Sequence, residues 1–128
     1  ISEICIKSVT SVLAYLDIKT LIIKSSSLYQ NQQMKGQDRI IDICKKENSD
    51  IYYNLIGGLN LYDREKFFSN GISLKFIQAH KTNYKQFTDI HIPNLSILDI
   101  LMFNSKEQIR TMLESYNIIN SLLANNKI

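Results

Sequence analysis

The spacing of apolar residues divides the chain into short helical and extended segments. Across Ser2–Asp17, apolar residues recur at intervals of three and four, which predicts an amphipathic helix with one face toward a core. The same periodicity predicts a second helix at about Asp38–Lys46 and a short third one after Asp63. Two further helices begin at Ser96 and Ser105, each at a polar residue that can cap a helix.

Three apolar runs are too short for helices and predict buried strands at Thr20–Ile23, Asp50–Ile56 and Ile72–Gln78. Strands that alternate with helices favour a parallel sheet with right-handed crossovers. The sequence therefore predicts the α/β class, with a small, mostly parallel sheet of three or more strands flanked by helices and followed by two C-terminal helices. We expect one domain over residues 1–123 and a frayed tail over 124–128.

Local signals mark the ends of the predicted helices. Asp38 and Asp63 are candidate N-caps, and Tyr62 and Phe67 occupy the two positions of a hydrophobic staple around the second cap. Gly71 supplies a left-handed residue that ends the third helix. These signals predict where the second and third helices begin and where the third one ends.

The last two helices carry similar signals. Ser96 with Asp99, and Ser105 with Gln108, have the spacing of capping boxes. The apolar face of the final helix is expected to extend to Tyr116. Asp99 therefore has two interpretations, as a capping residue and as a catalytic carboxylate.

Composition narrows the class of protein. The 128 residues are 45% hydrophobic and 21% charged, which excludes a disordered tail and a disulfide scaffold. The net charge of +3 comes from scattered basic residues, which argues against a nucleic-acid surface. No apolar run is long enough to insert in a membrane. Cys5 and Cys44 lie on predicted apolar faces, so we expect buried thiols and a reducing, cytoplasmic compartment. A first residue of Ile1 rather than Met indicates a piece of a longer protein.

The candidate site follows from the predicted sheet. Parallel sheets bind ligands beyond the carboxyl ends of their strands, and two connections there, Ser25–Gln37 and Ala79–Asn94, are unusually long. Loops that follow parallel strands share one edge, so side chains from all three loops should gather on one rim. The residues expected on that rim are Ser26, Tyr62, His80 and Tyr84.

Two features of this rim have both a functional and a structural interpretation. His80 suits a general base or a phosphate donor, and equally a surface hydrogen-bonding residue. Gly57 and Gly58 would let phosphate approach a helix start, or form an ordinary strand-to-helix turn. His91 alternates with isoleucines and is expected to face solvent. No histidine spacing typical of a metal site occurs, and no metal or cofactor is expected.

The second predicted helix carries a different candidate. Arg39 lies in its first turn beside a long loop and has the geometry to hold an anionic group bidentately. Asp38 and Asp42 share a face, and Asp42 is spaced to pair with Lys46, which is typical of a solvated helix surface.

Several segments, in this order and spacing, resemble the WbqC-like family over roughly Ile1–Ile119. The segments that carry the resemblance are KTLIIKSSSL, DRIIDICKKENSDIYYNLIGG, LYDREKFFSNGISLKFIQ, Tyr84–Lys85–Gln86 and LSILDILMFN. The family is bacterial and named from O-antigen gene clusters, so the resemblance implies a role in building surface polysaccharide on an activated or amino sugar. Family members also carry an N-terminal His-Gln-Pro and Tyr-x-Pro-Trp signature, which this sequence lacks, so we expect the C-terminal portion of a longer protein.

Two functions remain open at this stage. The first is a transferase that moves an acyl or aminoacyl group to a nucleotide-linked amino sugar, with Lys35 and Arg39 on phosphate and His80 or Asp99 as base. The residues expected to contact that small-molecule substrate are Ser26, Lys35, Asp38, Arg39, Gly57, Gly58, Tyr62, Tyr84 and Gln86. The alternative is a non-catalytic binding or assembly module of a polysaccharide-synthesis complex, with a homodimer or a pathway enzyme as its partner.

Overall fold

The chain forms two compact units. The computed structural model describes residues 2–120, and the tail expected to fray at 124–128 lies outside the described residues. Residues 2–26 and 81–115 form one unit, which we call the helical unit. Residues 27–80 and 116–120 form the other, which we call the sheet unit.

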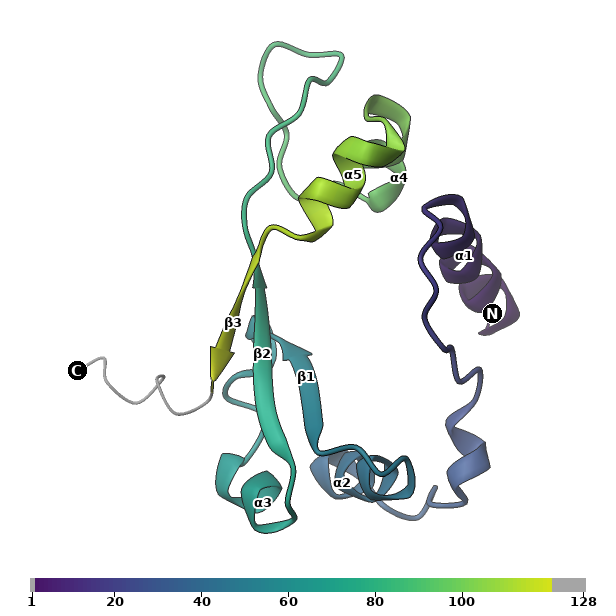
Figure 1. Ribbon diagram of the computed structural model, residues 1–128, viewed down its shortest axis with the longest axis vertical. Helices are drawn as coiled ribbons and strands as arrows, with labels where there is room; N and C mark the ends of the chain where they lie inside the picture. Colours follow the sequence, from purple (N-terminus) through teal and green to yellow (C-terminus); the bar gives the residue numbers. More distant parts are fainter. Residues whose placement is uncertain (1, 121–128) are drawn as a thin grey trace, which may run out of the picture. The chain divides into compact units, whose positions relative to one another are not determined.

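The sheet unit contains three strands with β2 in the centre (Figure 1). The strands β1 and β2 run parallel, with Ile51 opposite Ser73, and β2 and β3 run antiparallel, with Ala79 opposite Tyr116. The elements of this unit, with the 3-10 turn η1 that leads into it, are η1 Ser26–Tyr29, α2 Gly36–Lys46, β1 Ile51–Leu55, the 3-10 turn η2 Ile56–Gly58, α3 Arg64–Ser69, β2 Ser73–Ala79 and β3 Tyr116–Asn120.

The prediction of the α/β class is confirmed, but two details of the sheet are wrong. Thr20–Ile23 is irregular rather than a strand, and Leu21 within it is exposed. The final helix ends at Leu113, and the residues from Tyr116 to Asn120 form β3 instead of a last helical turn. The sheet is therefore mixed rather than mostly parallel. The reason is that a β-branched pair, Ile118 and Ile119, meets an open edge of β2 and satisfies its backbone groups.

The core of the sheet unit lies where α2 and α3 cover the sheet. Burial alternates along β2, as expected for a strand with one covered face, and the ring of Phe67 is fully buried against it. Phe67 stacks on Tyr52 at 5.7 Å and meets Tyr62 edge-on at 5.9 Å between ring centroids. The hydrophobic staple is thereby confirmed. The buried residues of this core are Ile41, Cys44, Phe67, Ile72, Leu74 and Phe76.

The predicted boundary signals of α3 are confirmed, while the one for α2 is wrong. The Asp63 side chain accepts a hydrogen bond from the Lys66 amide, and Gly71 ends the segment with φ of +75°. By contrast, α2 begins two residues earlier than predicted, after Lys35, which makes no side-chain cap. The reason is Gly36, whose φ of +52° turns the chain into the helix and places Asp38 in its first turn.

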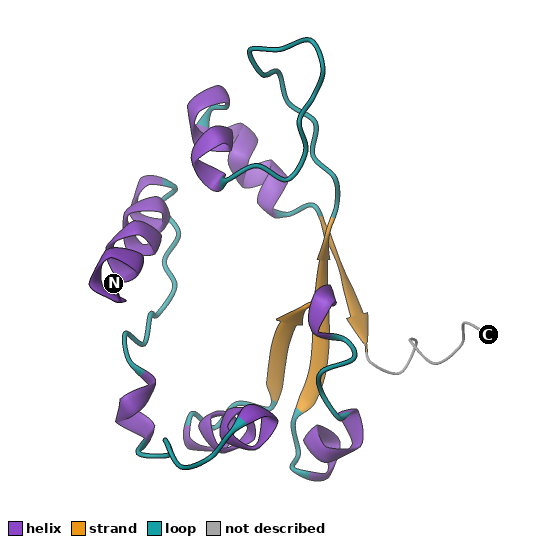
Figure 2. Ribbon diagram, turned by 180° about the vertical axis from the view of Figure 1, so that it is seen from behind, coloured by secondary structure: helices purple, strands orange, loops and turns teal. Residues whose placement is uncertain are grey.

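The helical unit contains α1 Ser2–Tyr15, α4 Ile97–Phe103 and α5 Lys106–Leu113. The caps predicted for the last two helices are confirmed: Ser96 accepts from the Leu98 amide, and Ser105 forms a full capping box with Gln108. Residues 80–96, which connect β2 to α4, contain no helix or strand, as the teal trace in Figure 2 illustrates.

Packing in the helical unit concentrates at the end of α1. Leu16 and Ile109 are buried, and the Arg110 guanidinium donates to the Leu16 carbonyl oxygen at 2.7 Å and to Asp17 at 3.2 Å. No residue within α1 itself is buried, and Cys5 is exposed, so the expectation of two buried thiols holds only for Cys44. Across residues 2–120, none of the helices has the length and apolar character needed to cross a membrane.

Candidate functional site

Three residues predicted from the sequence lie together in the helical unit. The Tyr84 hydroxyl donates to Asp99 Oδ2 at 2.5 Å, and Gln86 Nε2 lies 3.4 Å from the same oxygen. Asp99 belongs to the first turn of α4, whereas Tyr84 and Gln86 come from the irregular connection before it. We call this group the Tyr84–Asp99 cluster. Their predicted catalytic and binding roles stay predictions.

Gln86 also closes the loop that precedes α4. Its Nε2 donates to the Ile92 carbonyl oxygen at 3.0 Å, and its Oε1 accepts from the Ile92 amide at 2.8 Å. A side-chain amide thus makes the pair of bonds that a neighbouring strand would make. The five residues 87–91 are held between these two anchors. The sequence spacing of Tyr84 and Gln86 gave no sign of this second role.

Aromatic rings surround the cluster. His91 stands nearly perpendicular to Tyr84, with centroids 5.3 Å apart, and Phe103 lies 6.4 Å from the same ring. His91 was expected to face solvent, yet its Nδ1 is buried and finds no hydrogen-bond partner among the described residues. The expectation assumed the alternation of a strand, but this segment is an irregular loop, so alternation does not determine which side is covered.

The contacts define what each group in the cluster can do chemically. The hydrogen bond to Asp99 raises the pKa of Tyr84, because loss of the phenol proton would place two negative charges in contact. Tyr84 therefore remains a hydrogen-bond donor at neutral pH. Asp99 directs its carboxylate to Tyr84 and Gln86, so the capping box predicted for Ser96 and Asp99 does not form, although Ser96 itself caps the helix. A carboxylate oriented in this way can accept a proton or a cationic amine.

Arg39, in the sheet unit, contacts a residue that sequence reasoning missed. Asn31, with 1% of its surface exposed, donates to Asp42 Oδ2 at 2.6 Å and accepts from Arg39 Nε at 3.1 Å. The predicted pair of Asp42 and Lys46 is confirmed at 2.8 Å. Lys46 and then Asn31 hold the pKa of Asp42 below its ordinary value. Nothing in the polar segment around Asn31 distinguishes it from its neighbours in the sequence.

Asp38 joins two helices. Its carboxylate pairs with Lys66, and the neighbouring Gln37 accepts a hydrogen bond from the Asp63 amide at 2.8 Å. These contacts fasten the start of α2 to the start of α3, which gives Asp38 a structural role. Lys35 precedes α2 and is exposed.

The two glycines after β1 differ in their surroundings. A Cβ on Gly58 would lie 2.7 Å from Asn54 Nδ2 and 3.3 Å from the Tyr62 ring, whereas one on Gly57 would meet nothing within 4 Å. Gly58 is therefore required for a close-packed turn, which favours the structural interpretation. The ring of Tyr62 packs on Tyr52 and Phe67, so it belongs to the core and not to a rim.

The expected rim is only partly realised. Gly57 and Gly58 follow β1, and His80 follows β2, so these residues share the carboxyl edge of a parallel pair, as predicted. Ser26 was assigned to the rim through a strand that does not form. Tyr84 belongs to the helical unit with Asp99. The single-rim prediction is wrong because the sheet has one parallel pair instead of three parallel strands.

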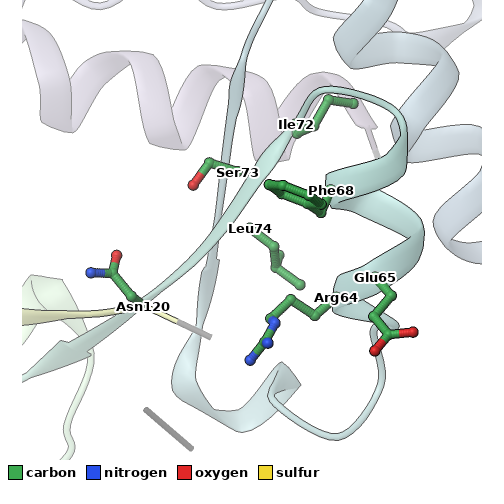
Figure 3. Close-up of a pocket in the computed structure, with 7 residues that line it drawn as sticks. All are labelled: Arg64, Glu65, Phe68, Ile72, Ser73, Leu74 and Asn120. Carbon is green, nitrogen blue, oxygen red and sulfur yellow. The ribbon is translucent and has the colours of Figure 1, made fainter. Parts of the chain in front are cut away.

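A pocket of about 300 Å³ lies in the sheet unit between α3 and the strands β2 and β3 (Figure 3). Its walls combine apolar side chains with the guanidinium of Arg64 and the amide of Asn120. Figure 3 shows Arg64 and Glu65 pointing in different directions from α3. The residues that line the pocket are Arg64, Glu65, Phe68, Ile72, Ser73, Leu74 and Asn120. No sequence motif marked them as a site.

Within residues 2–120, no three or more His, Cys, Asp or Glu side chains lie close enough to hold a metal ion. Cys44 is buried, and burial raises the pKa of its thiol.

Comparisons with known proteins identify one family. The WbqC-like protein family model matches residues 1–111, which is most of the chain. No curated protein and no solved structure matches.

Proposed function

Because the chain belongs to the WbqC-like protein family, we propose that it acts on an activated sugar in the synthesis of surface polysaccharide. The substrate we propose is a nucleotide-linked amino sugar. The contact of Lys35 and Arg39 with phosphate, expected from the sequence, stays a prediction.

The observation that carries this proposal is the Tyr84–Asp99 cluster. The family resemblance rests in part on Tyr84, Gln86 and Asp99. The side chains of Tyr84 and Gln86 both donate to Asp99, which follows them by 15 and 13 residues in the sequence. Asp99 was one of two candidate bases. We favour it over His80 because its carboxylate is oriented by two donors and is partly buried.

The proposed reaction transfers an acyl group from a thioester or aminoacyl ester to the amino group of the sugar. The sugar nitrogen attacks the acyl carbonyl carbon, a carbon–nitrogen bond forms, and the bond to the sulfur or oxygen leaving group breaks. Asp99 takes the proton that the nitrogen loses, and the leaving group later receives a proton. Tyr84 donates to Asp99 throughout and keeps its carboxylate in place.

A calorimetric titration tests this proposal. The 128-residue protein is titrated with UDP-glucosamine, which has a free amine, and with UDP-N-acetylglucosamine, which resembles an acylated product. We expect saturable heat with both compounds. An absence of binding with both of them would contradict the proposal.

A second candidate function, a binding module within a polysaccharide-synthesis complex, is favoured by apolar exposure in the helical unit. Phe87 is 91% exposed, Ile90 is 81% exposed and Met102 on α4 is 79% exposed. Apolar surface of this kind is typical of protein-binding sites. Co-purification tests this function: a glycosyltransferase recovered with the protein and lost with Met102→Lys supports it, and recovery of no pathway protein contradicts it.

A further inference from the structure

His91 carries a buried polar atom that no described residue satisfies. Its Nδ1 is covered and has no partner among the described residues, while its ring stands against Tyr84. A buried polar atom without a partner lowers stability, so proteins retain such atoms mainly where they serve a function. A phenyl ring would fill the same space without this cost.

The loop that carries His91 is held by bonds that can open. Both bonds between Gln86 and the Ile92 backbone are exposed, so water can replace either of them at small cost. Opening them frees residues 87–91 to turn the imidazole of His91. The ring lies next to Tyr84, whose hydroxyl is bound to Asp99.

We propose that His91 is a further ligand-binding residue of the Tyr84–Asp99 cluster, where its Nδ1 hydrogen-bonds a sugar hydroxyl. This inference rests on the proposed function. A hydroxyl both donates and accepts, so it satisfies Nδ1 in either tautomer of the imidazole. A polyhydroxylated ligand would therefore supply the partner that residues 2–120 do not, next to the carboxylate proposed to bind its amine.

The two histidines of the chain permit a direct test. In NMR spectra, protein labelled with ¹⁵N-histidine gives signals from His91 in the helical unit and from His80 in the sheet unit. UDP-glucosamine is titrated into this sample, and a parallel calorimetric titration measures its binding. We expect the His91 ring nitrogens to shift in a saturable way and those of His80 to stay constant.

A substitution provides the second measurement. His91→Phe keeps a ring against Tyr84 and removes the unpartnered nitrogen, so we expect an equal or higher melting temperature. The affinity for UDP-glucosamine should fall about tenfold, which is the loss of about 1.4 kcal/mol of binding free energy. Loss of affinity together with retained stability separates a ligand contact from a structural role.

The outcomes distinguish this inference from the function on which it rests. If UDP-glucosamine binds but the His91 signals stay constant and His91→Phe keeps its affinity, the inference about His91 is wrong and the proposed function stands. If neither nucleotide sugar binds, the proposed function fails and this inference fails with it. If His91→Phe does not fold, the labelled native protein alone decides.

Discussion

Asn31 is the residue whose importance is least visible in the sequence. It lies in a polar segment rich in glutamine and serine, yet its side chain is the only buried polar one among the described residues. Its two bonds join Asp42 and Arg39, which both belong to α2. The buried Asn31 amide therefore fastens the segment before α2 to the start of the helix, while Lys46 donates to the Tyr29 carbonyl oxygen nearer its end.

We predict that Asn31→Ala lowers the free energy of unfolding by about 1–3 kcal/mol, because it leaves two charged groups without their buried partner. Urea denaturation measures this loss. The matched control is Gln32→Ala, which removes one exposed bond to the Ser27 carbonyl oxygen. Equal stability of both variants would show that Asn31 does not hold the segment.

A second prediction concerns Asp42, whose pKa Lys46 and Asn31 hold below the ordinary value. A group with a lowered pKa in the folded state stabilises the protein above its unfolded pKa of about 4, and this contribution is lost as pH falls through the folded pKa. Asp42→Asn should therefore reduce the loss of melting temperature between about pH 5 and pH 2. Lys46→Met should reduce it partly. A pH profile unchanged by both substitutions would contradict the assignment.

At the scale of single elements, local signals in the sequence predicted the helices well. The caps Asp63, Ser96 and Ser105 and the stop at Gly71 all form, because each depends on residues within a few positions. The prediction that Cys5 is buried was wrong for a different reason. Periodicity predicts which face of α1 is apolar, but whether that face is covered depends on distant parts of the chain.

The turn after β1 provides a matched pair of substitutions. Gly58→Ala would bring a methyl group against the side-chain amide of Asn54. The oxygen of that side chain accepts a hydrogen bond from the Leu55 backbone amide, so the side chain can move only by weakening this bond. We expect a loss of about 1 kcal/mol in the free energy of unfolding, at the low end for overpacking. Gly57→Ala meets nothing within 4 Å and should be neutral or slightly stabilising. Thermal or urea denaturation of both variants decides, and equal stabilities would contradict the close packing at Gly58.

At the scale of the whole molecule, the sequence predicted the class of fold but not its sheet. The parallel pair of β1 and β2 around α3 was predictable, because a short helix links two apolar runs. The partner of β2 on its other edge was not. Ile118 and Ile119 continue the apolar spacing of α5, so periodicity alone assigns them to the helix, and only pairing with β2 makes them a strand.

The candidate site was predictable to a similar extent. Tyr84, Gln86 and Asp99 could be selected as candidates, but sheet topology assigned Tyr84 to the wrong neighbours. Their meeting depends on an irregular connection of 17 residues, 80–96, whose path no periodic signal describes. His91 and Asn31 were missed because burial of a polar residue in such a segment leaves no pattern in the sequence.

Hydrogen exchange tests the revised sheet. We predict that amides in Tyr116–Asn120 exchange slowly, because they pair with β2, and that amides in Thr20–Ile23 exchange fast. Peptide-resolved exchange followed by mass spectrometry measures both segments in one experiment. Slow exchange at Thr20–Ile23 with fast exchange at Tyr116–Asn120 would restore the parallel arrangement and contradict the mixed sheet.

The most direct test of the central claim is the affinity of Asp99→Asn for UDP-glucosamine, measured by calorimetry beside UDP-N-acetylglucosamine. Asparagine keeps the size of the side chain and can still accept from Tyr84, but it has no charge for the sugar amine. We predict a melting temperature close to that of the native protein and an affinity for UDP-glucosamine at least about tenfold weaker, with a smaller change for the uncharged acetamido sugar. The control, Glu114→Gln, removes an exposed carboxylate of the same unit and should leave both affinities unchanged. Unchanged binding of UDP-glucosamine by Asp99→Asn would contradict the assignment of Asp99 to the substrate site.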